Sequence, residues 1–510
     1  MSAEKACAPM TNGFPLSHVF EHEGAWYCFD TITSKLYECD EVLAAVIRSG
    51  DRIADPDVLA PLEAEWGRER IEAAVSELLA SQQTLGVLRQ TPLALLAECP
   101  ECADPRVRET QVQHLEMGVT EQCNLRCEYC SYGKARSWSR CHADVHMSRE
   151  TALAAVDHFL PRCVEAEDPA ISFYGGEPLL AFEVIREVVS HVRSRPDGER
   201  FRFTVDTNAT LIDDEVAEFL TREKLNVQVS LDGPREIHDR YRRTKSGAGT
   251  WDRVVAGVDR LLRLDRNAAG RILFMSTLAP PYDVEAVVDF FDDFPLYRER
   301  GIPTPPVVLV NFAELAGLDF RPRDLTESSC TEPAVALRGL RRRYLEACRR
   351  GEHDRLGPGM RALFDKEIVV FHHRARRAIV DAFVPTGSCD PGVRKLFVRA
   401  DGTFQPCERC GDDIVIGHVD RGIDAGAVRD LQRTMLRAVE GRCAECWAAR
   451  SCSICFAHMA PSWKAEGGAK IPNETCEAIR CAFEGTLRDY LTLRNAGPQA
   501  LEWLKNTTVK

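Results

Sequence analysis

The sequence lacks any long hydrophobic run. No stretch of about 18 consecutive apolar residues occurs among its 510 residues, so we expect no membrane-spanning helix. It also lacks a basic excess, because 65 Lys and Arg residues stand against 78 Asp and Glu residues, for a net charge of −13. A chain of this charge is not expected to bind nucleic acid. Residues 1–16 have no apolar core, which predicts a cytoplasmic protein without a secretory signal.

What the sequence has in excess is cysteine, with 21 residues. Thiols stay reduced in the cytosol, so this number indicates metal binding or catalysis rather than disulfides. Most of the cysteines fall in two groups, within 123–130 and within 389–481, at short spacings. The cysteines that stand alone are expected to be ordinary thiols, namely Cys7, Cys28, Cys39, Cys163 and Cys348.

Residues 1–95 are predicted to form a first unit of three short strands followed by three helices. Aromatic and β-branched residues mark the strands, and apolar residues at helical spacing mark the helices. The predicted strands are 18–20, 26–29 and 35–37, and the predicted helices are 40–49, 55–66 and 68–81. This order suggests a winged-helix module, joined to the rest of the chain by a charged linker over 96–113.

Residues 114–315 alternate between strand and helix patterns. The predicted strands are 115–119, 170–174, 202–206, 226–231, 272–278 and 306–311, and the helices include 148–160, 181–194, 213–223, 250–264 and 283–292. Six such units predict an α/β fold, a partial (β/α)6 barrel whose ligands bind where the strands end. Beyond it we expect a helical bridge over 316–385, a cysteine-dense domain organised by metal over 386–483, and a tail over 484–510.

The first cysteine group directly follows the first predicted barrel strand. Cys123, Cys127 and Cys130 have the spacing C-x3-C-x2-C, with Tyr129 before the last cysteine. Three thiolates can ligate three irons of a [4Fe–4S] cluster and leave the fourth iron without a protein ligand. The alternative is a zinc site, but zinc sites normally close with four ligands at paired C-x2-C spacings.

This triad resembles that of the radical SAM superfamily. The resemblance implies that the open iron binds S-adenosylmethionine (SAM) through its amino and carboxylate groups. It also implies that an electron from the cluster cleaves SAM to a 5′-deoxyadenosyl radical. A second motif supports the resemblance, because Tyr174-Gly175-Gly176-Glu177-Pro178 follows the second strand and is similar to the family's GGE motif. By resemblance, the backbone of this motif and Glu177 receive the SAM amino group.

Two further strand ends carry matching motifs. By resemblance, Asn208 after the third strand and Ser230 at the end of the fourth face the ribose of SAM. Ala209 stands where relatives usually have Gly, so this turn departs from the family pattern. The SAM carboxylate is expected to meet Arg242 or Arg243. The remaining candidate is Asp232, which is either the catalytic acid or base or a brace for its loop.

The second cysteine group has the spacing C-x12-G-x4-C, then C-x2-C-x5-C-x2-C, then a last cysteine. It resembles a SPASM domain, which carries two auxiliary [4Fe–4S] clusters, although the familiar pattern has x3 where Cys452 and Cys455 are two residues apart. By resemblance, one cluster is ligated by Cys443, Cys446, Cys452 and Cys476. The other takes Cys389, Cys407 and Cys455, and its fourth ligand is Cys410, Cys481 or none. The alternative for the C-x2-C pairs is a zinc ribbon.

The first unit resembles the peptide-recognition element of ribosomal-peptide maturases. Such an element binds a leader peptide as an added strand, and the expected docking edge is near Lys35–Glu38. DNA binding by a winged helix is the first alternative, but no helix presents a basic face. A purely structural cap is the second. The core resembles thioether-forming maturases in three stretches, 130–134, 171–180 and 390–398.

These features predict a radical SAM maturase that installs thioether cross-links in a ribosomally made precursor peptide. Joining a C–H carbon to a thiol removes two electrons and two protons, so the expected auxiliary clusters would accept an electron. An open iron there would also bind the substrate thiolate. The expected partners are the precursor peptide and a reductant such as flavodoxin or ferredoxin. The alternatives are formylglycine formation, as in anaerobic sulfatase maturation, and a non-enzymatic iron–sulfur electron carrier.

Overall fold

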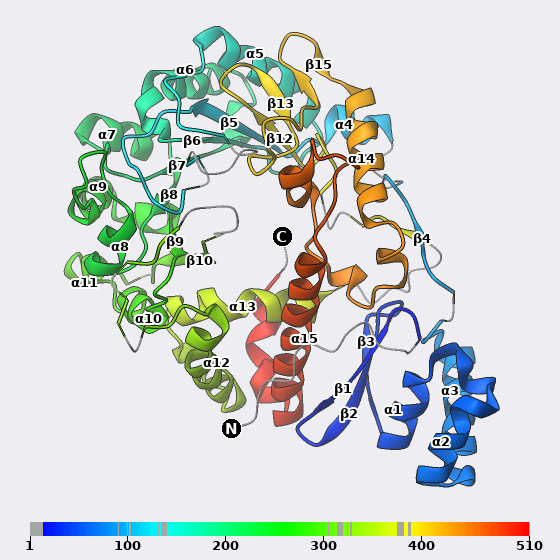
Figure 1. Cartoon of the computed structure of the whole chain (residues 1–510). Coiled ribbons are helices and arrows are strands. Elements are labelled where there is room, and N and C mark those ends of the chain that lie inside the picture. The colour runs from blue at the N-terminus through cyan, green and yellow to red at the C-terminus, as the bar shows by residue number, and fades with distance from the viewer. Residues whose placement is uncertain are drawn as a thin grey trace.

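The structure is a computed structural model of the chain (Figure 1). It describes residues 14–508 apart from 90, 99, 101–103, 131, 134–139, 304, 314–319, 324, 327–328, 375–381 and 386–388. Within these limits, no helix is both long enough and apolar enough to cross a membrane. Cys7, which we expected to be an ordinary thiol, lies outside the described residues.

A ten-stranded sheet forms the centre of the molecule, in the order β10-β9-β8-β7-β6-β5-β12-β13-β14-β15. The strands from β10 to β12 are parallel to their neighbours. The first six of these form where the sequence predicts them, and each end is within one residue of the prediction. They are β5 (His114–Thr120), β6 (Ala170–Gly175), β7 (Arg202–Thr207), β8 (Asn226–Ser230), β9 (Ile272–Leu278) and β10 (Val307–Phe312).

Helices follow the strands and lie on the outer side of the curved sheet (Figure 1). They are α5 (Arg149–Phe159), α6 (Phe182–Arg193), α7 (Asp214–Arg222), α8 (Arg235–Tyr241), α9 (Trp251–Leu264), α10 (Val284–Asp292) and α11 (Pro295–Glu299). Side-chain caps set where two of them begin, because Ser148 accepts from the N–H of Thr151 and Asp213 from that of Val216. The predicted barrel architecture is therefore confirmed as a mixed α/β fold with a large sheet.

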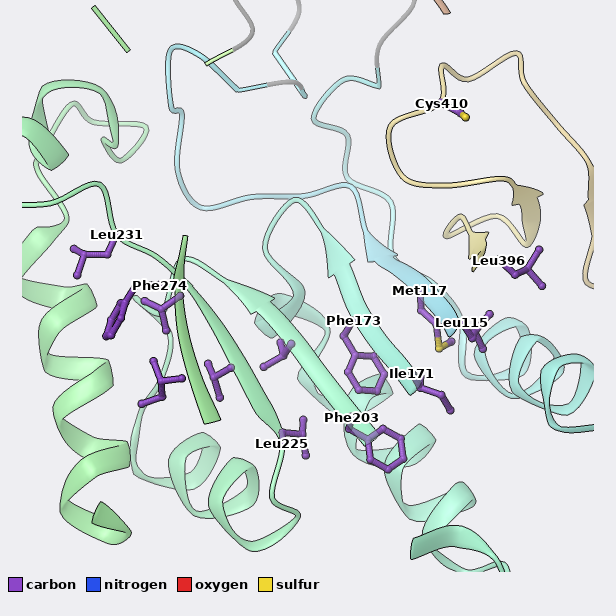
Figure 2. Close-up of a cluster of buried hydrophobic side chains, with 14 of the residues drawn as sticks. Leu115, Met117, Ile171, Phe173, Phe203, Leu225, Leu231, Phe274, Leu396 and Cys410 are labelled. Carbon is purple, nitrogen blue, oxygen red and sulfur yellow. The ribbon is translucent and has the colours of Figure 1, made fainter. Parts of the chain in front are cut away.

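Side chains alternate between the two faces of the barrel strands. One set is apolar and packs toward the helices, and Figure 2 shows Leu115, Ile171, Phe173 and Phe203 in this layer. The other set points into the hollow of the sheet and is largely polar: His114, Glu116, Ser172, Tyr174, Thr204, Asp206, Gln228 and Ser230. The hollow therefore offers polar groups to ligands while the outer layer forms the core.

The N-terminal unit has the three strands and three helices that the sequence predicts. Its strands are β1 (Ser17–His22), β2 (Ala25–Asp30) and β3 (Lys35–Cys39), paired antiparallel in the order β1-β2-β3. Its helices are α1 (Glu41–Arg48), α2 (Pro56–Trp66) and α3 (Arg68–Leu85). One face of this small sheet, with Val19 and Cys28, packs against α1 and α3 in a core of its own.

The other face of the small sheet packs against the C-terminal end of the chain (Figure 1). The Phe29 ring lies 5.3 Å from that of Phe483, edge to face, and His18 stacks on Trp447 with ring centroids 4.0 Å apart. We expected a tail over 484–510, and this is wrong. Residues 473–496 form the helix α15 (Asn473–Ala496) and a 3-10 helix follows, with Leu487 and Leu504 fully buried.

The cysteine-dense region extends the central sheet. Its first strand, β12, pairs with β5 in parallel, and the next three continue the sheet antiparallel. Its elements are β12 (Lys395–Val398), β13 (Thr403–Gln405), β14 (Gly417–His418), β15 (Gly422–Ile423) and α14 (Ala425–Val439). This pairing places the loop after β13 beside the hollow of the barrel.

The described part of the bridge is mainly helical, as predicted, with α12 (Pro333–Arg349) and α13 (Pro358–His373). The stretch predicted as a linker includes one short helix, α4 (Pro105–Thr110). Just before it, β4 (Ala94–Leu95) pairs in parallel with β11 (Ala382–Phe383). The residues just before the predicted linker therefore pair with the last residues of the bridge.

Candidate functional site

A cavity of about 290 Å³ lies where the barrel strands end. All three cysteines of the first group line it, together with polar side chains from four strand ends. The lining includes Cys123, Cys127, Tyr129, Cys130, Tyr132, Tyr174, Gly175, Gly176, Asp206, Asn208, Ser230, Arg242 and Thr277. The structure therefore brings together the cysteine triad and six of the eight other site residues that the sequence singled out.

Glycine is required where β6 meets the cysteine loop. Gly175 has φ +138°, and a Cβ there would lie 2.1 Å from the carbonyl oxygen of Thr120. A Cβ on Gly176 would lie 2.2 Å from the carbonyl oxygen of Gln122. The N–H groups of Gly176 and Glu177 instead donate to these two carbonyls, at 2.9 and 2.8 Å. This close contact fixes the backbone that leads into Cys123.

The three cysteines of the cavity are free thiols. Burial raises the pKa of Cys123 to about 11 and that of Cys127 to about 12. The N–H of Leu125 donates to the Cys123 sulfur at 3.3 Å, and the Arg126 guanidinium donates to the Cys123 carbonyl at 2.7 Å. The loop thus presents its sulfurs to the cavity, where a metal would displace their protons.

Glu177 does not line the cavity. It is 1% exposed, and its carboxylate accepts from the N–H of Leu179 at 3.1 Å, the hydroxyl of Thr207 at 2.6 Å and the N–H of Asn208 at 2.7 Å. Burial raises its pKa to about 7. The carboxylate lies behind the residues that line the cavity, where it connects the ends of β6 and β7. We expected it to receive the amino group of SAM, but it does not face the cavity.

Asp232 also lies behind the cavity wall, 2% exposed. It accepts from the hydroxyl of Tyr129, from Nε of Arg242 at 2.8 Å and from the N–H of Thr277 at 2.9 Å. These three partners line the cavity and Asp232 does not. This arrangement favours the alternative that Asp232 braces its surroundings, because it orients Tyr129 and Arg242.

Arg242 and Arg243 differ in position. Arg242 lines the cavity, whereas the Arg243 side chain donates to the carbonyls of Arg240 and Gly247 and does not line it. Of the two arginines expected to bind the SAM carboxylate, only Arg242 therefore lines the cavity.

Ala209 adopts φ +57°, so the turn that relatives make with glycine is made here with a buried alanine.

Asp206 is a cavity residue that we did not single out. It is the penultimate residue of β7, two positions before Asn208, and burial raises its pKa to about 7 from the usual 3.8. Its sequence signal is its position in Asp206-Thr-Asn208, because every second residue of a strand points to the same face. It is the one carboxyl group in the described lining of this cavity.

A second cavity, of about 480 Å³, lies at the opposite ends of the same strands. Cys389, Cys407, Cys410 and Cys455 line it, together with inward residues of four barrel strands: His114, Ser172, Thr204 and Gln228. Three of these residues, Ser172, Thr204 and Gln228, lie two positions before residues that line the first cavity. Those residues of the first cavity are Tyr174, Asp206 and Ser230. Two residues span about 6.6 Å of strand, so adjacent layers of inward side chains line the two cavities.

A buried charge cluster, formed by Glu116, Lys395 and Glu408, lies beside the second cavity, which Lys395 lines. The ammonium group of Lys395 lies 2.8 Å from the Glu116 carboxylate and 2.6 Å from that of Glu408. Although burial acts in the opposite direction, Lys395 holds the pKa of Glu408 near 2, whereas burial raises the pKa of Glu116. The cluster attaches β12 to β5 inside the barrel.

The other cysteines of the second group, Cys443, Cys446, Cys452 and Cys476, are also free thiols and lie near one another. Burial, and after it the three neighbouring thiols, raises the pKa of Cys443 to about 12. Within the described residues, no three His, Cys, Asp or Glu side chains are arranged to hold a single metal ion. A mononuclear zinc site needs ligands that converge on one ion at about 2.3 Å, whereas cluster ligands surround a larger body.

Residues 117–294 match the family model of the Radical SAM superfamily. The chain contains a radical SAM domain.

Curated proteins match about a third of the chain. The serine-type anaerobic sulfatase-maturating enzyme of Bacteroides thetaiotaomicron is 27% identical over 189 residues, 36% of this chain and 44% of that protein. The cysteine-type enzyme of Clostridium perfringens is 32% identical over 197 residues, 35% of this chain and 51% of that protein. The chain thus spans about half the length of these relatives, which are enzymes.

Solved structures extend the likeness of fold beyond the radical SAM domain. Native anSMEcpe with bound AdoMet and Cp18Cys peptide superposes with a TM-score of 0.52 at 18% identity. The match covers 78% of this chain and 99% of that one.

A radical SAM domain uses a [4Fe–4S] cluster and SAM, and the donor set of the first cavity fits both. Three free thiols at C-x3-C-x2-C spacing would supply the cluster ligands, and the lining also offers the polar side chains of Asn208, Ser230 and Arg242 to a polar ligand. The individual SAM contacts of Tyr129, Gly175, Gly176, Asn208, Ser230 and Arg242 stay predictions.

Proposed function

We propose that this enzyme is a peptide maturase that joins a cysteine sulfur to a carbon of a ribosomally made precursor peptide. The observation that carries the proposal is the edge of the N-terminal sheet. In the described residues β3 is paired on one side only, by β2, while both faces of the sheet are covered. An open edge on a covered sheet is suited to taking up one further strand, such as a leader peptide.

The open edge presents main-chain groups in a regular pattern. The carbonyl of Ser34 accepts from Nε of Arg374 at 2.9 Å, and that of Leu36 accepts from Arg494 at 3.5 Å, so both point away from β2. Every second residue of an antiparallel strand points the same way, which places the N–H and C=O of Glu38 on this side too. The Arg494 contact is long, so an incoming strand would replace it at little cost.

We also propose that the two outer cysteine sets hold auxiliary [4Fe–4S] clusters, which makes three in all. Cys443, Cys446, Cys452 and Cys476 would hold one, and Cys389, Cys407 and Cys455 the other. When bound, the cluster of the first cavity and SAM would supply a 5′-deoxyadenosyl radical, and the auxiliary clusters would accept electrons. A cysteine cavity one layer below the first cavity suits a reaction that removes two electrons from its substrate. The electrons for SAM cleavage would come from a partner such as flavodoxin or ferredoxin.

The chain's own residues would hold and orient the reactants. Arg242, fixed by Asp232, would bind the SAM carboxylate, and Asn208 and Ser230 would bind the ribose. Tyr132 and Tyr174 form an aromatic wall, with ring centroids 6.4 Å apart, that would exclude water from the radical. Asp206 is the carboxyl group placed to take up a proton from this cavity.

Formylglycine formation is the second candidate, and the sulfatase-maturating relatives favour it. It uses the same core and also removes two electrons. The two reactions leave different products, because a thioether keeps the sulfur while formylglycine loses it. A single assay with two peptides therefore separates them.

The assay incubates the reduced holoenzyme with SAM and either a candidate precursor, chosen as a short cysteine-bearing peptide from the reading frames beside its gene, or the Cp18Cys peptide. Mass spectrometry then reads the product under anaerobic conditions. We expect the first peptide to lose two hydrogens, keep its sulfur and have no free thiol. Loss of sulfur from either peptide would support formylglycine formation instead, and no 5′-deoxyadenosine at all would contradict both candidates.

The role of the β3 edge is tested with Glu38→Pro in the full chain. Deleting residues 1–95 is unsuitable because it would expose Trp447 and Phe483. Proline at 38 removes only an outward N–H, since Tyr37 and Cys39 carry the pairing with β2. One lost main-chain hydrogen bond of about 1–1.5 kcal/mol predicts roughly tenfold weaker leader-dependent modification.

Glu38→Ala is the matched control and keeps the N–H, so we expect it to behave as wild type. SAM cleavage without peptide should be equal in all three proteins, because residue 38 is far from the barrel in the fold. Equal modification by wild type and Glu38→Pro would show that the leader docks elsewhere.

A further inference from the structure

We propose that Cys410 is the fourth ligand at the Cys389/Cys407/Cys455 site, so that a cluster there has a protein thiolate on every iron. The inference rests on the proposed function, in which this cavity holds an auxiliary cluster. It removes a choice that spacing alone leaves open, between Cys410, Cys481 and an unligated iron.

The four cysteines share one cavity. Cys389, Cys407, Cys410 and Cys455 all contribute to its wall, and the sulfurs of Cys407 and Cys410 are 3.8 Å apart. Cys410 is 2% exposed, so its thiol faces the cavity and the core rather than solvent. All four are free thiols. C-x2-C is also the spacing at which ferredoxin cysteines ligate one cluster.

The loop that carries Cys410 is held from inside the protein. It follows β13 (Thr403–Gln405), and Figure 2 draws Cys410 on this loop. The Gln405 side chain is fully buried and donates to the carbonyls of Gly411 and Ile414, at 2.7 and 3.1 Å. The N–H of Cys410 donates to the carbonyl of Cys407 at 3.3 Å. This turn fixes both sulfurs on the same side.

The competing ligands are placed less well. Cys481 is exposed on α15 and does not line the cavity. His114 lines the cavity, but its Nε2 lies 2.7 Å from the Ser172 hydroxyl. Asp390 lines it as well and is held by Arg108 at 2.9 Å. In each case the group is either outside the cavity or engaged by a protein partner.

A fully ligated cluster has a consequence for the reaction. No iron at this site would remain for a substrate thiolate, so the site would serve electron transfer and not substrate binding. The substrate cysteine must then be held by protein groups. This separates the present chain from a mechanism in which the auxiliary cluster holds the sulfur that is to be joined.

The test uses the full chain with Cys123, Cys127 and Cys130 replaced by alanine, so that only auxiliary clusters are present. Clusters with an iron that lacks a protein ligand lose that iron on mild oxidation with ferricyanide and give a [3Fe–4S] electron paramagnetic resonance signal. We expect no such signal from this background. Adding Cys410→Ala should produce the signal, and adding Cys481→Ala should not. Cys410→Ser nearly keeps the side-chain volume and should give the same signal as Cys410→Ala. Agreement between the two variants would show that the signal does not come from misfolding of the loop.

The outcomes are distinct. A three-iron signal in the background itself, or with Cys481→Ala but not with either Cys410 variant, would overturn the assignment while leaving the auxiliary clusters in place. A background protein that binds neither iron nor sulfide would overturn the auxiliary-cluster part of the proposed function and the assignment with it. The readout is spectroscopic, so it does not depend on knowing the peptide.

Discussion

Asp206 is the carboxyl group that the first cavity offers, and its protonation sets a pH dependence. Burial raises its pKa to about 7, above the usual 3.8. The folded state therefore holds this proton more tightly than the unfolded chain. Its contribution to stability is complete below about pH 4 and is lost as the pH rises through 7, by at most about 1.4 kcal/mol per pH unit.

Asp206→Asn should remove this dependence, because the amide stays neutral. We expect the thermal midpoint of the holoenzyme to fall between pH 5.5 and pH 8 in wild type, and to fall less in the variant. Differential scanning calorimetry at the two pH values measures this. Parallel pH curves for the two proteins would mean that Asp206 does not titrate in this range.

At the level of single residues, the sequence predicts position better than role. The spacing of Cys123, Cys127 and Cys130 after a strand was enough to place three sulfurs at one cavity. Whether a carboxylate faces that cavity depends on which neighbours bond its oxygens. Glu177 and Asp232 are turned away because Thr207 and Arg242 reach them, and these partners are 30 and 10 residues away in the chain.

Strand β12 is the element that connects the radical SAM domain to the cysteine-rich region. Lys395 begins it and lies between the carboxylates of Glu116 and Glu408. Lys395→Met would leave two carboxylates unpaired inside the barrel. Breaking a buried pair costs about 3–5 kcal/mol, so we expect a large loss of stability in chemical denaturation of the holoenzyme.

Lys464→Met is the matched control for this prediction. Lys464 pairs with Asp413, but its side chain is 74% exposed, so the change should cost under about 1 kcal/mol. A similar small loss in both variants would show that the buried cluster does not stabilise β12.

Among the elements, the barrel strands could be predicted and the added ones could not. Alternating or continuous apolar patterns mark β5 to β10 locally. The pairing of β12 with β5 joins residues about 280 positions apart, and β14 and β15 have only two residues each. Such pairing is decided by tertiary contacts, which leave no local periodicity.

At the scale of the whole molecule, the N-terminal unit contacts the helix α15 near the C-terminus. His18 on β1 pairs with Glu484 on α15 at 3.0 Å, and Arg488 donates to the carbonyl of Glu21 at 2.6 Å. This contact could not be predicted from the sequence, because an amphipathic pattern shows that one face of a helix is buried but not which element covers it. The region predicted as a tail therefore includes most of the helix surface against which the N-terminal unit packs.

Replacing Phe29 tests this contact between the N-terminal unit and α15. It is fully buried on the face of the small sheet that meets α15, with its ring 5.3 Å from Phe483 and 6.2 Å from Phe371. Phe29→Ala should cost about 3–5 kcal/mol and loosen the contact between the unit and α15. Ile71→Ala, in the unit's own core on α3, should cost about 2–5 kcal/mol without affecting α15.

Hydrogen–deuterium exchange of the holoenzyme distinguishes the two variants. We expect amides in α15 to exchange faster in Phe29→Ala and at the wild-type rate in Ile71→Ala, while α1 and α3 are affected by both. If the contact also holds the leader near the barrel, Phe29→Ala should lower leader-dependent modification more than Ile71→Ala does. Equal protection of α15 in both variants would mean that the N-terminal unit and the C-terminal helix unfold as one body, and the β3 edge would then be a fixed part of the catalytic core.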